Sequence, residues 1–285
     1  MGELRVMTFN MWFGGTAGGQ PLEQSAEVIR AARADVVGLQ EGSRFPAGEH
    51  PDNAERMAHL LGWHYLAQGR NRGIMSRFPV LDQTPKKWGA RIDMPGDANV
   101  WLFNTHFAHA PYQPFQLIGI PYADAPFLNN AAEAVASASE ARAEHAAAML
   151  AEINAVPADA TVFVTGDFNE PSSLDWTNPA ADAGRCPLAV EWPTPTAFYA
   201  EGFVDTYRHI HPDPVTSPGC TWTPTTAPDD PNDHHDRIDF VMVRGADVEI
   251  SGSEIVGENA SFSDIVVSPY PSDHRAVVST VRLPT

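Results

Sequence analysis

Apolar residues along the chain follow two different periods. Runs rich in β-branched and aromatic residues predict strands, and an apolar residue every three or four positions predicts a helix. The predicted strands are 3–10, 35–41, 63–67, 73–81, 100–107, 161–167, 237–243, 247–256 and 274–283, and the predicted helices are 22–34, 53–61 and 131–154. Two segments, 107–130 and 171–236, are rich in proline and show neither period, which predicts long loops apart from the run GFVDTYR at 202–208.

The order of these elements indicates the class of fold. Strands occur in both halves of the chain with few helices between them, which favours an α/β (α+β) fold with sheets packed on each other and covered by helices. No internal repeat or linker interrupts the pattern. We therefore expect residues 1–285 to form a single domain.

The charge of the chain limits the class of substrate. There are 36 acidic residues against 18 basic ones, which gives a formal net charge of −18. A protein that grips duplex nucleic acid usually presents a basic face. The charge therefore argues against duplex nucleic acid as a partner and favours a small or weakly charged substrate. Phosphate chemistry stays compatible with it, because metal ions can supply positive charge.

Hydropathy and cysteine usage add expectations about location and oxidation state. No run of about 18 uncharged apolar residues occurs, so no membrane span is expected. The first residues lack the basic and apolar regions of a signal peptide, so a cytoplasmic location is expected unless a leader has been removed. Cys186 and Cys220 lack metal-binding spacing, which favours two free thiols over one disulfide. The oligomeric state is left open.

Polar residues stand where the predicted strands end. The sequence letters at these ends are dominated by Asn, Asp, Glu and His, at Asn10, Gln40–Glu41, Asn104–His106, Asp167–Asn169, Asp239 and Ser272–His274. A single polar residue at the end of a strand is explained by contact with water. Six of this composition indicate a functional site built on a rigid base.

These residue types suit the hydrolysis of a phosphate ester. Such a reaction needs a hard cation held by carboxylate and amide oxygens, which Glu41, Asn10 and Asp273 could provide. It also needs a base that orients and deprotonates water, and Asp167 is suitable. The residues therefore indicate a metal site beside a carboxylate base.

Charge that develops on the phosphoryl oxygens needs hydrogen-bond donors. His106, His274 and Asn169 could donate to these oxygens. A histidine in this role needs a carboxylate on its other nitrogen to fix its tautomer and favour protonation, and Asp239 can supply it. Together with the metal residues, these side chains form a complete hydrolytic set.

The motifs that carry these residues resemble a known superfamily. In chain order they are TFN (8–10), LQE (39–41), GIMSRFPV (73–80), NTHF (104–107), TGDFN (165–169), DRIDFV (236–241) and SDH (272–274). As an ordered set, they resemble the endonuclease/exonuclease/phosphatase superfamily. It includes deoxyribonuclease I-like nucleases, abasic-site endonucleases, inositol polyphosphate 5-phosphatases and neutral sphingomyelinases.

The resemblance implies a four-layer α/β/β/α sandwich, with two mixed sheets packed face to face and flanked by helices. It implies a site for Mg²⁺ or Mn²⁺, with Ca²⁺ as an alternative, and leaves one or two metals open. By match to the motifs, Glu41 is the principal metal ligand with Asn10 and Asp273 nearby, and Asp167 is the general base. Asn169 contacts the scissile phosphate, Asp239 pairs with His274, and His106 is the second histidine.

Other metal sites fit the sequence less well. GDFNE is shared with calcineurin-like phosphoesterases, but their downstream GNH motif is missing. The acidic segment 229–239 lacks the glycine of an EF-hand loop. His106 and His109 could begin a zinc site, but no third ligand follows at helical spacing.

A second group of residues could face the substrate. Taken singly, each is better explained by loop packing, but as a group they flank the motif residues and suit an aromatic pocket with a few polar groups. They are Arg70, Asn71, His109, Tyr112, Trp176 and His235. The segments HFAHAPYQPFQL and HHD, to which several belong, are not typical of DNA-cleaving members.

The sequence therefore predicts a metal-dependent hydrolase acting on a phosphodiester, or secondarily a phosphomonoester, in a small molecule or lipid head group. An endonuclease or exonuclease acting on DNA or RNA is the alternative enzyme. An inactive binding module with the same fold is the alternative outside catalysis, and the complete motif set argues against it.

Overall fold

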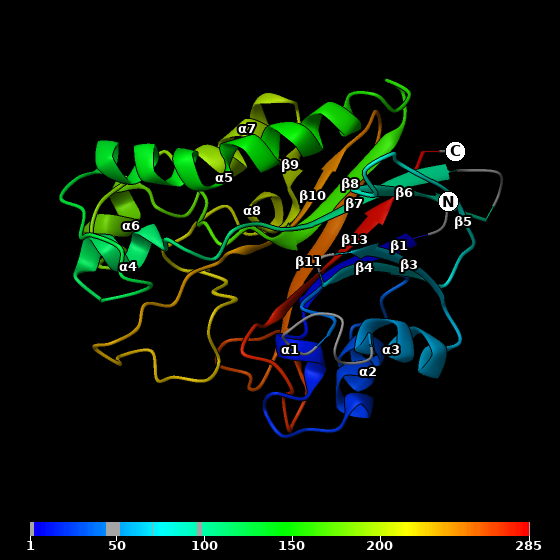
Figure 1. The fold of residues 1–285 in the computed structure, drawn as a ribbon, viewed down its shortest axis with the longest axis horizontal. Coiled ribbons are helices and arrows are strands. Elements are labelled where there is room, and N and C mark those ends of the chain that lie inside the picture. The colour runs from blue at the N-terminus through cyan, green and yellow to red at the C-terminus, as the bar shows by residue number, and fades with distance from the viewer. Residues whose placement is uncertain (1–2, 44–51, 70, 96–98, 285) are drawn as a thin grey trace.

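Two mixed β-sheets lie face to face in the computed structural model, which describes residues 3–43, 52–69, 71–95 and 99–284 (Figure 1). The first sheet has the strand order β12 (Ile265–Val266), β11 (Glu249–Gly257), β13 (Ala276–Arg282), β1 (Glu3–Asn10), β2 (Val36–Gln40), β4 (Arg72–Ser76) and β3 (His64–Gly69). The second has the order β5 (Val80–Gln83), β6 (Gly89–Asp93), β7 (Asn99–His106), β8 (Thr161–Asp167), β10 (Asp239–Arg244) and β9 (Val204–Asp205).

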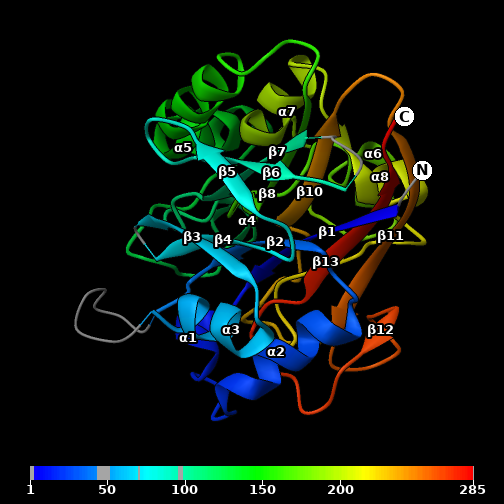
Figure 2. The same cartoon turned by 90° about the vertical axis from the view of Figure 1, so that its right-hand side faces the viewer.

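Helices cover the outer face of each sheet (Figure 2). The helices α2 (Leu22–Ala31) and α3 (Asn53–Leu61) pack on the first sheet, and α5 (Ala131–Ile153) and α7 (Pro193–Ala200) pack on the second. A third apolar core, which includes Val6, Leu102 and Phe163, fills the space between the sheets. The predicted four-layer α/β/β/α sandwich is therefore confirmed.

The capping residues explain where two of these helices begin. The Asp52 carboxylate accepts hydrogen bonds from the Ala54 and Glu55 amides and starts α3, and Gly62 ends that helix in a left-handed conformation. The Asn130 side chain accepts from the Glu133 amide and starts α5. Each cap satisfies a backbone group that the first or last turn leaves unpaired.

The two predicted loops contain helices that the sequence did not reveal. The segment 107–130 includes α4 (Gln113–Ile118), and 171–236 includes α6 (Asn178–Asp182), α7 and α8 (Thr206–Ile210). Three of these four helices, α4, α6 and α7, have proline in the first turn, where its missing N–H costs nothing. Some of the prolines that indicated loops therefore mark helix starts. The sequence also did not predict the strands β6 and β12 or the short helix α1 (Trp12–Gly15). The predicted strand 73–81 is two separate strands, β4 and β5.

Parallel pairing brings the polar strand ends to one edge of the sandwich. The pairs β1–β2 and β7–β8 are parallel, so their carboxyl ends lie at the same edge. The strand β10 is antiparallel to β8 and begins at this edge, with Asp239 opposite Asp167. His106 is also in register with Asp167. Among the described residues, no helix is both long and apolar enough to cross a membrane.

The two sheets approach each other closely at Gly38 in β2. A Cβ atom built there would lie 2.0 Å from Thr165 Oγ1 and 2.5 Å from Asn104 Oδ1, which both belong to the second sheet. Only a residue without a side chain fits between the sheets here. Gly252 in β11 differs, because a Cβ atom there would meet nothing closer than Thr280 at 3.8 Å.

We therefore expect Gly38→Ala to lower the free energy of unfolding by about 1–3 kcal/mol, the usual cost of overpacking a core. Gly252→Ala is the matched control and should change stability much less. Urea unfolding followed by circular dichroism measures both. Equal effects of the two substitutions would show that the close approach at Gly38 does not constrain the fold.

Candidate active site

Asp167, at the end of β8, lies at the centre of the polar strand ends. Its side chain is 1% exposed, and its Oδ1 accepts a hydrogen bond from the Asn169 amide at 2.9 Å. Its Oδ2 accepts from Asn10 Nδ2 at 2.9 Å. The Nε2 atoms of His106 and His274 lie 3.4 Å and 3.7 Å from the same oxygen. Four predicted site residues from different segments therefore surround one carboxylate.

Asp239 and His274 form a buried pair beside it. Asp239 Oδ2 lies 2.9 Å from His274 Nδ1, which leaves Nε2 directed toward Asp167. Burial opposes protonation of His274, but the charges of Asp239 and Asp167 outweigh it and hold the pKa of this imidazole well above its usual value. The surroundings therefore favour an imidazolium that donates to Asp239 from Nδ1 and has its Nε2 beside Asp167.

Glu41 and Asn10 are held by the backbone that follows β1. The Phe13 amide donates to Glu41 Oε2 at 3.0 Å, and the Trp12 amide donates to Asn10 Oδ1 at 3.0 Å. Glu41, Trp12 and Phe13 all have positive φ angles, between 48° and 54°. This left-handed conformation is uncommon for residues other than glycine, and here it turns the backbone amides toward the two side chains.

The oxygen atoms of Glu41, Asn10 and Asp273 suit a hard divalent cation. Asp273 Oδ1 is buried and has no hydrogen-bond partner among the described residues. Burial raises the pKa of Asp273 to about 6, and the negative charges of Glu41 and Asp167 add to this effect. An unpaired buried carboxylate near other carboxylates is the environment that a cation would stabilise. The residues present therefore fit the metal that the motifs imply.

A second group of possible ligands consists of Asp167, Asp239 and His274, whose ligand atoms all lie within 4.8 Å of one another. In this group, however, His274 Nδ1 already bonds to Asp239. The arrangement therefore resembles a hydrogen-bonded relay more than a metal cage. The oxygen-rich group around Glu41 is the better match to the preference of Mg²⁺ and Mn²⁺.

Asn169 lies beside the Asp167 carboxylate, which accepts a hydrogen bond from its backbone amide. It adopts a left-handed conformation with φ 50°, and its Nδ2 donates to the Phe107 carbonyl oxygen at 3.2 Å. The Phe107 amide in turn donates to the Asp167 carbonyl oxygen at 3.0 Å. The ends of β7 and β8 are thus tied together where His106 and Asp167 leave the sheet.

The predicted substrate residues lie in several different environments. His109 is exposed and packs edge-on against Tyr122, with ring centroids 6.4 Å apart. Asn71 Oδ1 accepts from the Ser43 hydroxyl at 2.6 Å and so supports the chain that follows Glu41. Arg70 lies outside the described residues. Of the two described residues, His109 is exposed and Asn71 is half-buried.

Tyr112 and Trp176 pack inside the protein. Their side chains are 2% and 3% exposed, and both donate to the carboxylate of Asp236, at 2.8 Å each. His234 Nδ1 lies 3.0 Å from the same carboxylate. A buried carboxylate requires such partners, so the structure places these two aromatic residues around Asp236.

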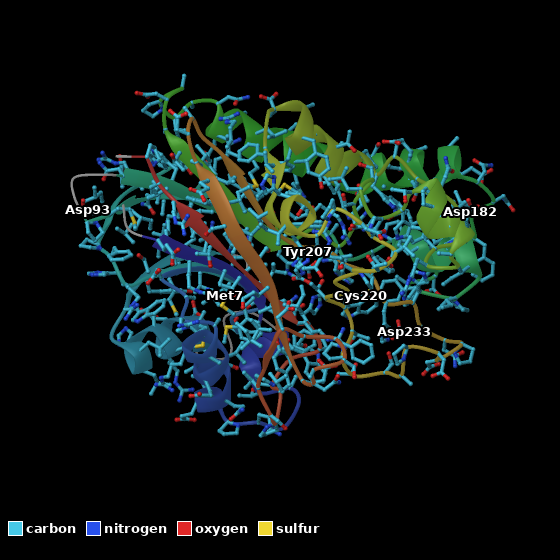
Figure 3. The ribbon with its side chains drawn as sticks, turned by 180° about the vertical axis from the view of Figure 1, so that it is seen from behind. Met7, Asp93, Asp182, Tyr207, Cys220 and Asp233 are labelled. Atoms are coloured by element: carbon cyan, nitrogen blue, oxygen red, sulfur yellow. The ribbon has the colours of Figure 1, made fainter. Side chains whose placement is uncertain are left out.

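His235 and Trp176 contribute to a cavity away from the strand ends. Its volume is about 450 Å³, and it contains none of the eight predicted catalytic and metal residues. Figure 3 shows this region from behind, where the labelled Tyr207, Cys220 and Asp233 belong to its lining. The candidate active site is therefore a separate place, at the edge where the strands end. Cys186 and Cys220 are free thiols, as expected.

Two aromatic residues beside the site were not predicted. The Trp222 ring lies 6.3 Å from the His274 ring, and Trp222 forms isolated backbone bridges with Asp236 and with His274. The half-buried Tyr122 has a raised pKa because of burial and because of the charges of Asp167, Glu41 and Asp273. Proline-rich surroundings marked both segments as shaping loops, but nothing in the sequence selected these particular residues.

The chain is similar to known proteins over nearly its whole length. The profile of the Endonuclease/Exonuclease/phosphatase family matches residues 7–274. An uncharacterized protein of Caenorhabditis elegans is 26% identical over 303 residues, which cover 96% of this chain and 90% of that protein.

Solved structures show the same fold. A family protein from Bacteroides vulgatus matches with a TM-score of 0.60 and 17% identity over the full length of both chains. One from Beutenbergia cavernae matches with a TM-score of 0.58 and 20% identity, covering 99% of this chain and 72% of its own. D. rerio TDP2, complexed with a single-strand DNA product, matches with a TM-score of 0.56 and 16% identity, covering 99% of each chain. The chain belongs to the Endonuclease/Exonuclease/phosphatase family, whose members are divalent-metal-dependent phosphoester hydrolases.

Proposed function

We propose that this protein is a divalent-metal-dependent phosphodiesterase that acts on a small molecule or a lipid head group. The observation that supports it most is the convergence at Asp167 Oδ2, where Asn10, His106 and His274 all lie within 3.7 Å of one carboxylate oxygen. A carboxylate surrounded by donors from separate segments is suited to orient water beside a phosphoryl group. Phosphomonoester hydrolysis is the less favoured reaction.

Glu41, Asn10 and Asp273 would hold the metal. When bound, Mg²⁺ or Mn²⁺ supplies positive charge that polarises the phosphoryl group. Asn10 can contribute because its Oδ1 accepts only the Trp12 amide among the described residues and an amide oxygen has two lone pairs. The backbone amides at Trp12 and Phe13 would fix these oxygens before the substrate arrives.

The remaining residues would act on water and on the phosphoryl oxygens. Asp167 takes a proton from the attacking water at Oδ2, while its Oδ1 stays fixed by the Asn169 amide. As the P–O bond to the leaving group breaks, His106, His274 and Asn169 donate to the oxygens that gain negative charge. Asp239 keeps His274 in the protonated form that donates.

The positive side chains near the site support a compact substrate. Four arginines in this half of the chain are buried in ion pairs with carboxylates: Arg142 with Glu170, Arg208 with Asp175, Arg237 with Asp205 and Arg275 with Glu258. Each of these arginines is at most 5% exposed. Side chains already neutralised inside the protein cannot track a nucleic-acid backbone, which needs several exposed cations.

A nuclease is the second candidate. The observation that favours it is the similarity of fold to D. rerio TDP2, which was solved with a single-strand DNA product. A single strand needs fewer backbone contacts than a duplex, so the acidic surface argues against it less strongly. An inactive binding module is the third candidate, and the presence of all eight predicted residues in one chain argues against it.

The metal assignment predicts the behaviour of Glu41→Gln. Loss of the carboxylate charge should weaken Mn²⁺ binding and abolish activity at low metal, and excess metal should restore part of it. Glu27→Gln, on the exposed face of α2, is the matched control. Isothermal titration with Mn²⁺ measures the affinity. A Glu41→Gln protein that titrates like wild type would exclude Glu41 as a ligand.

The pairing of Asp239 with His274 predicts a change of titration. In wild type the raised pKa keeps His274 protonated through neutral pH. Asp239→Asn removes the largest of the charges that raise it, so the pKa should fall. Nitrogen-15 NMR of labelled histidines in metal-free protein measures this change, with the exposed His59 as an internal reference. An unchanged pKa of His274 in Asp239→Asn would show that Asp239 does not control the protonation of His274.

The substrate assignment is tested by salt dependence. Bis-aryl phosphate should be hydrolysed with Mg²⁺ or Mn²⁺ at rates that depend weakly on salt, and supercoiled plasmid should not be nicked under the same conditions. Mono-aryl phosphate, cyclic phosphate, sphingomyelin and single-strand DNA complete the panel. Nicking at comparable rates that ~0.2 M salt suppresses, as counterion release requires, would favour the nuclease instead.

A further inference from the structure

Arg142, in the middle of α5, is fully buried and lies behind the candidate active site. It is 0% exposed. Its Nε donates to the Ala108 carbonyl oxygen at 3.0 Å, its Nη2 to the Pro111 carbonyl oxygen at 2.9 Å, and its Nη1 to Gln113 Oε1 at 2.8 Å. Ala108 and Pro111 belong to the segment that joins His106 to α4, and Gln113 is the first residue of α4. One guanidinium therefore fixes the path of this segment.

The same guanidinium also contacts the segment that follows β8. Arg142 Nη1 lies 3.5 Å from Glu170 Oε2, and Glu170 is 0% exposed. The Glu170 carboxylate accepts from the Thr194 amide and hydroxyl, both at 2.7 Å, which anchors it to α7. Glu170 is the residue directly after Asn169. The two segments that leave β7 and β8 are thus held by one buried ion pair.

Asn169 lies between these two attachments. On one side it is joined to Glu170 by a peptide bond, and on the other its Nδ2 donates to the Phe107 carbonyl oxygen at 3.2 Å. Phe107 is the residue before Ala108, whose carbonyl oxygen Arg142 binds. A shift of the guanidinium would therefore move the Phe107 carbonyl oxygen and Glu170, which hold the Asn169 side chain in place.

Stability alone does not explain a buried ion pair in this place. Transferring both charges from water is costly, and an apolar pair of similar volume is often equally stable or more stable. An apolar side chain, however, could not bond two carbonyl oxygens and an amide oxygen in fixed directions. The planar fork of arginine supplies these directions, and the ammonium group of lysine does not.

We propose that Arg142 is a positioning residue that orients the Asn169 side chain toward the scissile phosphate through Glu170 and the 107–113 segment. The proposal rests on the proposed function, because it takes Asn169 as the phosphate contact. Arg142 itself touches neither substrate nor metal in this assignment. Its contribution should therefore appear in kcat and disappear when Asn169 is removed.

Arg142→Lys tests this, because it keeps the charge and removes the fork. With bis-aryl phosphate, kcat should fall on the order of 10²-fold with KM nearly unchanged, the scale of loss from a small misplacement of a catalytic group. In an Asn169→Ala background, Arg142→Lys should cause little further loss. A large loss in that background, or no loss in the wild-type background, would overturn the proposal.

Arg5→Lys is the matched control. Arg5 also donates in several directions, to the Ala32 carbonyl oxygen, Thr280 Oγ1 and Glu254 Oε2, but it lies at the other end of β1. Its substitution should leave kcat unchanged. If Arg142→Lys does not fold, Gln113→Met removes one of the acceptors while nearly keeping the volume, and it should give a smaller loss that is again absent with Asn169→Ala. No loss from Gln113→Met would then overturn the proposal.

The Asn169 side-chain amide gives a readout that does not need activity. Its NMR signals should shift in Arg142→Lys and stay in place in Arg5→Lys. If wild type hydrolyses none of the phosphate esters, the proposed function fails, while a shift of these signals would still support the structural link. If wild type is active and the signals do not respond to Arg142→Lys, the positioning role fails alone.

Discussion

The contact between the two sheets at Gly38 is the constraint on which the rest of the site depends. Because Gly38 has no side chain, Thr165 and Asn104 of the second sheet can approach β2 within the space that a Cβ atom would occupy. This close contact fixes the position of β1 and β2 in the first sheet relative to β7 and β8 in the second. Glu41 and His106, which follow from different sheets, consequently end 4.0 Å apart, between Glu41 Oε1 and His106 Nε2.

Buried amides beside this contact keep the sheets in that alignment. Gln40 Nε2 donates to Asn104 Oδ1 at 2.6 Å, and Asn104 Nδ2 donates to Gln68 Oε1 at 2.7 Å and to the Leu39 carbonyl oxygen at 2.9 Å. All three amide side chains are at most 6% exposed. Buried polar groups without partners are costly, so a slip between the sheets would break several bonds together. Gln40 and Asn104, which the sequence placed among the polar strand ends, therefore serve the sheet interface and not the reaction.

The parts of the site that could be predicted from sequence are those that one strand end supplies by itself. Asp167 and His106 follow apolar runs, so both their position and their chemistry are visible in local sequence. The surroundings of Tyr112 and Trp176 could not be predicted in the same way, because both side chains bond to Asp236, which is 124 and 60 positions away along the chain. Trp222 was missed because it pairs with His274, which belongs to another segment. The short helices were missed for a related reason, since a proline in a first turn and a proline in a loop look alike without tertiary context.

The candidate site has two parts with different charge: one contains the positive imidazolium of His274, and the other contains the carboxylates of Glu41 and Asp273. In one half, the His274 imidazolium lies 2.9 Å from Asp239 and 3.7 Å from Asp167, so positive charge is built into the protein. In the other half, Glu41 and Asp273 repel each other, and Asp273 reaches a pKa of about 6 chiefly because it is buried. A carboxylate in that condition takes up either a proton or a cation as pH allows. The charge of His274 partly offsets the negative charge of Asp273, and a divalent cation bound beside Glu41 and Asp273, as proposed above, would offset it further.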